Sequence, residues 1–275
     1  RIQVKKLQAE QARIWLDVAL PTLEVNNIFI LKYDQLAPVE QAEMKIWFRD
    51  NVFPVLTPLA VDSGHKFPFI SNLSENLGVL VGPPNSSEHL FARIKIPKVL
   101  PRYITLPSGS DDHIRLLPLD ELIKNNLDAL FPEMAIHDCV PFRITRNASL
   151  EVPDDDTDNL YEHVEAELHL RRFARAVRIE VPLDPCLPIL DFITNELNLT
   201  KENVYARPGP LEYKDLFEVA ALERPDLKLS HYIPIVPTQL TDDAADLFAL
   251  IREKDIFLHH PYESFKASIE RFISA

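Results

Sequence analysis

Residues 256–272 read IFLHHPYESFKASIERF. The apolar run 256–258 predicts a short strand, and Pro261 marks a tight junction after it. Apolar residues then recur at helical spacing and predict the first turns of an amphipathic helix; they are Tyr262, Phe265, Ile269, Phe272 and Ile273. A strand, a junction and a helix open an α/β unit. We therefore expect this stretch to begin a domain that continues past residue 275.

The N-terminal end of the chain begins inside a helical pattern of apolar residues. Residue 1 is Arg, and Val4, Leu7, Ile14 and Val18 follow a helical spacing without a preceding cap. Pro21 is expected to end this helix. Both ends thus look cut, which suggests a fragment of a longer protein.

Between these ends, short strands and helices follow one another without regular alternation, which predicts an α+β fold. The expected helices cover residues 1–20, 38–52, 117–130, 154–174, 185–197, 211–221 and 241–253. The expected strands cover residues 77–81, 90–96, 103–106, 142–147, 177–181 and 204–206. We predict three parts: a helical segment over 1–52, a mixed α+β domain over 53–240, and a linker helix with the start of a further domain over 241–275.

Composition narrows the function classes. The net charge is -13, from 29 basic and 42 acidic residues, which argues against nonspecific binding of nucleic acid or anionic lipid. Cys139 and Cys186 show no metal-site or disulfide spacing and suggest a reducing, cytoplasmic environment. No apolar run is long enough to span a membrane, and residues 1–20 do not resemble a signal peptide. We expect a cytoplasmic protein without a nucleic-acid partner.

Arginines are the candidate phosphate ligands, because a guanidinium fork matches phosphate oxygens. The candidates are Arg143, Arg146, Arg171, Arg172 and Arg175, with Arg178 in the same run. The alternative is structural: the later arginines close a helix that opens with the acidic run 154–158, and they would complement its dipole or pair with its acids.

The pair His259 and His260 could ligate a metal or relay protons. Adjacent residues on a strand point to opposite faces, so a structural role beside Tyr262 at the strand-to-helix junction is favoured. The chain has only five glycines and contains no phosphate-binding glycine loop. G-x-S-x-G and H-E-x-x-H are absent too. These residues alone provide no complete active site, and we predict no metal ligands.

Several blocks in fixed order resemble the bacterial polyphosphate kinase family over almost the whole chain. They are VLTPL at 55–59, FPFISN at 67–72, FRITRNA at 142–148, YARPGPL at 205–211 and DIFLHHPYESF at 255–265. The resemblance implies an enzyme that reversibly transfers the terminal phosphate of ATP to polyphosphate through a phosphohistidine, with Mg²⁺. It also implies a homo-oligomer, cytoplasmic or peripherally associated with a membrane.

The family's phosphorylated histidine stands in an H-x-K setting, and none of the nine histidines here has lysine two places later. The resemblance therefore implies the end of the N-terminal helical domain, the head domain, and the first strand and helix of the catalytic half. We expect no catalytic residue, metal or nucleotide within the fragment, which would supply dimer contacts and tunnel architecture and be inactive alone. A non-catalytic oligomerisation or ligand-binding module is the alternative.

Overall fold

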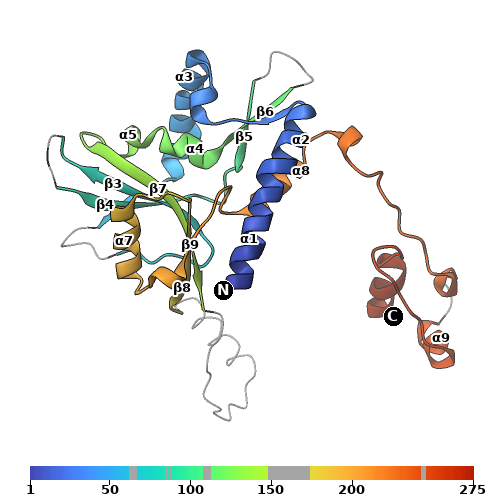
Figure 1. Cartoon of the computed structure of the whole chain (residues 1–275). Coiled ribbons are helices and arrows are strands. Elements are labelled where there is room, and N and C mark those ends of the chain that lie inside the picture. The colour runs from blue at the N-terminus through green and yellow to red at the C-terminus, as the bar shows by residue number, and fades with distance from the viewer. Residues whose placement is uncertain (62–66, 85, 87, 108–112, 148–173, 243–245) are drawn as a thin grey trace, which may run out of the picture. The chain divides into compact units, whose positions relative to one another are not determined.

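The computed structural model describes residues 1–61, 67–84, 86, 88–107, 113–147, 174–242 and 246–275. The chain forms two compact units, Arg1–Ala221 and Leu222–Ala275 (Figure 1). The three-part division made from the sequence stays a prediction.

A six-stranded sheet forms the centre of the first unit, in the order β2-β4-β3-β7-β8-β9. The strands are β2 Leu59–Val61, β3 Glu75–Gly82, β4 Leu90–Lys95, β7 Ala135–Arg146, β8 Ala176–Val181 and β9 Val204–Ala206. Neighbouring strands are antiparallel except β8 and β9. The predicted strands of this sheet are present, but β7 starts at Ala135 and the prediction covered only its second half, from residue 142. β2 was expected to be irregular.

A second, three-stranded sheet has the order β1-β6-β5, with β1 Ile28–Ile30, β6 Ile114–Pro118 and β5 Tyr103–Leu106. β5 was predicted, whereas β1 and β6 were not. A three-residue strand such as β1 is too short to show a period in sequence. With helices and two mixed sheets, the α+β prediction is confirmed.

The N-terminal helix does not end at Pro21, so that prediction was wrong. α1 Ile2–Ile14 passes through a π-helical turn, Trp15–Ala19, into α2 Leu20–Val25. Pro21 occupies the start of α2, where a missing N–H costs least. The wider turn before it lets the helix continue.

The predicted helix 117–130 is interrupted. It consists of α4 Leu119–Lys124 and α5 Leu127–Leu130, and residues 117–118 belong to β6. Asn125 and Asn126 separate the two helices by donating side-chain N–H groups to carbonyls of the preceding turn. Such bonds compete with the backbone ladder.

The other predicted helices of this unit are present. α3 Pro38–Trp47 continues as a π-helical turn, Phe48–Val52, and α7 Leu187–Glu196 and α8 Leu216–Ala220 follow later. Short 3₁₀ turns cover Tyr33–Gln35, Phe53–Val55, Lys201–Asn203 and Tyr213–Asp215. The predicted helix 154–174 falls almost wholly outside the described residues.

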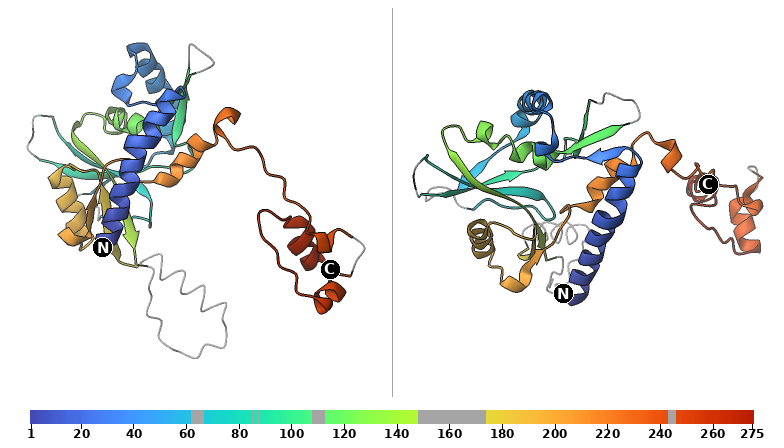
Figure 2. Two further views of the ribbon diagram at one scale, coloured as in Figure 1. Left: turned by 45° about the vertical axis from the view of Figure 1, so that its right-hand side comes forward. Right: turned by 45° about the horizontal axis from the view of Figure 1, so that its top comes forward.

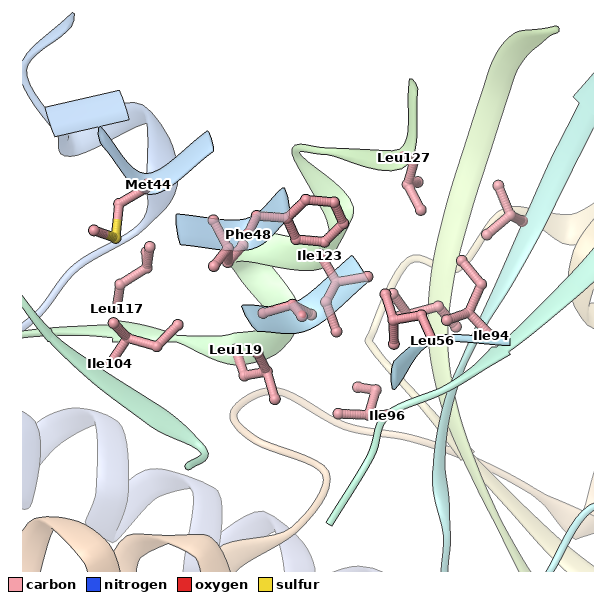
Figure 3. Packing of buried hydrophobic residues seen from close by; sticks show 14 of the residues in the cluster. Met44, Phe48, Leu56, Ile94, Ile96, Ile104, Leu117, Leu119, Ile123 and Leu127 are labelled. Atoms are coloured by element: carbon pink, nitrogen blue, oxygen red, sulfur yellow. The ribbon is translucent and has the colours of Figure 1, made fainter. Parts of the chain in front are cut away.

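Two apolar cores lie on the two faces of the six-stranded sheet. On one face, Met44, Phe48 and Ile123 from the helices meet Ile94 and Leu56 (Figure 3). On the other face, α7 lies along the sheet (Figure 2), and its Ile189 and Ile193 are buried in the second core. Gly78 permits this approach, because a Cβ there would lie 3.0 Å from Ile189 Cγ2.

The second unit contains α9 Leu247–Glu253, a π-helical turn Lys266–Glu270 and α10 Arg271–Ser274. It also has the 3₁₀ turns Pro225–Leu227 and Thr238–Leu240. Asp246 caps α9 by accepting from Phe248 and Ala249 N–H. No described helix is long and apolar enough to cross a membrane.

The predicted strand at 256–258 is wrong for the described structure. Those residues form no strand, and the described part of this unit contains only one isolated bridge, between Ile235 and Glu263. A strand needs a neighbour to satisfy its backbone groups. The helix predicted after Pro261 is confirmed.

Candidate functional site

The most prominent site in the first unit is a cavity of about 370 Å³. Its wall combines apolar and charged groups, contributed by the N-terminal helix, both sheets, α4 and the segment that follows β9. The charged residues that line it are Lys32, Glu75, Arg102, Asp120, Glu121, Lys124, Glu212 and Asp215. Among these described residues, five carboxyl groups face three cations. Among these described residues, the lining thus carries no excess positive charge that would favour a polyanionic occupant.

Arg102 links two carboxyl groups of the cavity. Its guanidinium lies 3.1 Å from Glu75 and 3.1 Å from Asp215. Burial raises the pKa of Glu75 to about 7, although Arg102 opposes the rise. Burial also raises the pKa of Asp215, again against Arg102. The two carboxyl groups thus share one cation, and burial favours the protonated form of each.

Lys124 forms a second charged group on the same wall. Its Nζ lies 3.1 Å from Asp120 and 3.2 Å from Glu121. Burial by itself lowers the pKa of Lys124, but the two carboxylates outweigh it and raise the pKa. This ammonium group is therefore held charged and already paired.

Beside the cavity, the fully buried Glu180 of β8 gathers three arginines. Arg143 of β7 donates through Nε at 2.9 Å and pairs through Nη2 at 2.8 Å. Arg207 Nε lies 3.4 Å and Arg178 Nη2 3.6 Å from the carboxylate. Gln8 of α1 donates at 2.8 Å to Oε1, the oxygen that Arg207 also faces. One carboxylate thereby joins four segments of the chain. We call Glu180 together with Gln8, Arg143, Arg178 and Arg207 the Glu180 cluster.

Arg143 was a candidate phosphate ligand, and the structure gives it protein partners instead. Besides Glu180, it donates through Nη1 to Glu212 on the cavity wall at 2.8 Å. Its side chain is only 11% exposed. Phosphate binding by Arg143 stays a prediction.

Arg146 is similarly occupied. Nε and Nη2 donate to the Ile70 carbonyl at 2.9 and 2.7 Å, and Nη1 donates to the Ala174 carbonyl at 2.7 Å. Its guanidinium also lies 4.5 Å from the ring centroid of Phe69. Arg146 thus holds together segments next to the end of β7.

The remaining arginine candidates are not brought to the cavity by the described structure. Arg175 precedes β8 with an exposed side chain, and its carbonyl accepts from Asn147 N–H at 3.0 Å. Arg171 and Arg172 lie outside the described residues.

The second unit contains the histidine pair. His259 N–H donates to the Glu263 carboxylate at 2.8 Å, and His260 Nδ1 lies 2.9 Å from the Glu263 carbonyl oxygen. The His259 ring contacts Tyr262, and the His260 ring contacts Phe265. The two rings thus have different neighbours, and a structural role at the junction stays a prediction.

Sequence reasoning missed the residues that organise this site. Glu75, Arg102 and Asp215 are far apart in the chain and carry no motif. Glu180 gave a usable signal: a carboxylate between Ile179 and Val181 in a six-residue strand demands a buried partner.

Comparison with known proteins assigns the chain to a family. Residues 39–219 match the polyphosphate kinase middle domain. The polyphosphate kinase of Streptomyces coelicolor is 38% identical over 273 residues, which cover 98% of this chain and 36% of that protein. That of Mycobacterium tuberculosis strain H37Rv is 38% identical over 283 residues, covering 98% of this chain and 38% of the relative.

A solved structure shares the fold. The crystal structure of polyphosphate kinase from Porphyromonas gingivalis superposes with a TM-score of 0.73 at 22% identity, covering 99% of this chain and 39% of that one. The chain spans less than two fifths of the length of these relatives. By sequence and fold together, it belongs to the polyphosphate kinase family.

Proposed function

We propose that this chain is the middle-domain part of an enzyme that reversibly transfers the terminal phosphate of ATP to polyphosphate. The match of residues 39–219 to the polyphosphate kinase middle domain carries this proposal. The transfer passes through a phosphohistidine and uses Mg²⁺, as the family resemblance implies. Since no histidine of this sequence stands in an H-x-K setting, the phosphorylated residue belongs to another part of the parent protein.

The role of the chain within that enzyme is structural. Arg143 and Arg146 direct their guanidinium groups to carboxylates and carbonyls of the protein. In the cavity lining, Arg102 and Lys124 each pair with two carboxyl groups, which leaves these cations less available to a polyanion. These contacts support a domain that shapes the approach to a catalytic site rather than one that holds phosphate.

We further propose that the parent enzyme is a homo-oligomer in the cytoplasm, with peripheral membrane association. The N-terminal helix supports an additional contact surface, because Leu7 and Val25 are 70% and 84% exposed. Apolar side chains gathered along one helix favour burial against a partner.

Labelling with ATP that carries a radioactive γ-phosphate tests the proposal. The parent gene product should form acid-labile phosphohistidine and elongate polyphosphate, and the 275-residue chain should do neither. A parent protein without either activity would refute the kinase proposal and favour a non-catalytic oligomerisation or ligand-binding module. Phosphate transfer by the 275-residue chain itself would refute the structural role.

Calorimetry separates ligand binding from catalysis. Titration of the 275-residue chain with ATP and with long-chain polyphosphate should give no binding stronger than millimolar. Tighter binding that is lost in Arg175→Gln, whose side chain is exposed, would instead assign phosphate binding to this part of the protein.

A further inference from the structure

Two exposed histidines from different strands meet at one end of the six-stranded sheet. His89 directly precedes β4, and His137 lies within β7. Their ring centroids are 4.3 Å apart, with an angle of 68° between the ring planes. Neither residue lines the charged cavity. The pair needs its own explanation, because β3 separates the two strands.

A β-bulge brings His137 toward this meeting point. Leu80 of β3 pairs with Asp138 and the next residue, Val81, pairs with Ile136. His137 is therefore the extra residue of β7, without a partner opposite. A bulge of this kind bends the strand locally and redirects the side chain of the added residue.

Gly82, the last residue of β3, leaves the space in which the two histidines approach. A Cβ at this position would lie 3.3 Å from His137 Nε2 and 2.2 Å from the Glu88 carbonyl oxygen. A larger residue would thus push away both His137 and the backbone next to His89. The absence of a side chain lets the segments on either side of β3 close over its end.

The backbone around His89 is held on both sides. Glu88 N–H donates to Ser86 Oγ at 3.0 Å, and Leu90 pairs with Val81. The position of the imidazole therefore depends on the fold as well as on its own rotamer. The site is partly organised before any ligand arrives.

We propose that His89 and His137 form a binding site for a late divalent transition metal such as Zn²⁺ or Ni²⁺. Each neutral imidazole contributes one nitrogen, and water completes the coordination. Imidazole suits these ions, whereas Mg²⁺ and Ca²⁺ prefer oxygen ligands. Because both side chains are exposed, they can rotate from this edge contact until one nitrogen of each ring faces a shared ion at the Zn–N distance of about 2.1 Å.

The site uses two protein ligands and leaves other positions open. Across the described residues, no group of three or more His, Cys, Asp or Glu side chains could hold a metal. Binding should thus be reversible and weaker than at a closed structural zinc site. His259 and His260 offer no equivalent, because their rings contact different aromatic side chains.

Calorimetric titration of the 275-residue chain with nickel chloride and with zinc chloride tests the site. The solution should be near neutral or mildly alkaline, so that histidine is uncharged. His89→Gln and His137→Gln remove one ligand each. His231→Gln is the matched control, since His231 is exposed and lies in the second unit. Circular dichroism verifies that all four proteins are folded.

The unsubstituted 275-residue chain and the control His231→Gln should each bind one equivalent of metal, with equal affinity. Loss of an outer-shell partner already weakens metal binding by about 10–100-fold, so loss of a direct ligand should weaken it by at least about tenfold. Electron paramagnetic resonance of the Cu²⁺ form should show two coupled nitrogens in the unsubstituted chain and one in His89→Gln and in His137→Gln. Unchanged affinity in both of these variants, or no binding by the unsubstituted chain up to millimolar metal, would overturn the proposal.

Discussion

Glu75 provides a direct test of the electrostatics of the cavity. Its side chain is 15% exposed, and burial raises its pKa from 4.5 to about 7. An unfolded chain releases this proton near 4.5, whereas the folded protein retains it until about 7. The unfolded state therefore binds fewer protons in this interval, and stability falls as the pH rises through it.

The variant Glu75→Gln removes this titration without changing the size of the side chain. The interval from 4.5 to about 7 corresponds to about 3 kcal/mol of unfolding free energy as an upper bound. Glu75→Gln has no such group to titrate, so its unfolding free energy does not fall in this way. The unfolding free energy of Glu75→Gln minus that of the unsubstituted chain should therefore increase between mildly acidic and mildly alkaline pH, by up to about 3 kcal/mol.

Urea unfolding followed by tryptophan fluorescence measures the difference. The chain has two tryptophans, Trp15 and Trp47, and both lie in the unit Arg1–Ala221, so the signal reports that unit alone. Glu43→Gln is the matched control, because Glu43 is exposed. If Glu75→Gln and Glu43→Gln show parallel pH profiles, Glu75 does not hold its proton in the folded protein, and the reasoning fails.

Three further substitutions test the packing of the same unit, again by urea unfolding. Glu180→Ala removes the fully buried carboxylate that three arginines share and should cost about 3–5 kcal/mol, whereas Glu202→Ala, at a carboxylate 76% exposed, should change stability by less than about 1 kcal/mol; equal losses would refute the Glu180 cluster. Phe142→Ala removes a fully buried ring and should cost about 3–5 kcal/mol; a smaller loss would mean that the core collapses around it. Gly78→Ala places a methyl group 2.9 Å from Phe91 Cε2 and should destabilise by about 1–3 kcal/mol, and unchanged stability would show that this ring moves freely.

Much of the fold could be predicted because local patterns were strong. The strands at 103–106 and 204–206 have the predicted bounds, since short apolar runs stood between prolines or polar turns. The N-terminal helix was predicted too short, because a proline rule cannot anticipate a π-helical turn. The strand at 256–258 failed for a non-local reason: an extended apolar segment becomes a strand only beside another one.

The candidate site could be predicted only in part. Arginines 143 and 146 stood out by residue type and spacing, yet their partners could not be found from the sequence. Arg143 bonds to carboxylates 37 and 69 residues away, and only the topology brings those segments together. The same holds for His89 and His137, which become neighbours through a bulge and a glycine.

The Glu180 cluster also limits how this sequence can diverge. Replacing the carboxylate first would leave buried positive charge, and replacing Arg143 or Arg207 first would alter the charge balance around it. The effects of such substitutions are therefore not additive. Among homologues, positions 8, 143, 180 and 207 should change together or not at all. An alignment should therefore show correlated substitutions between these positions, which are far apart in the chain.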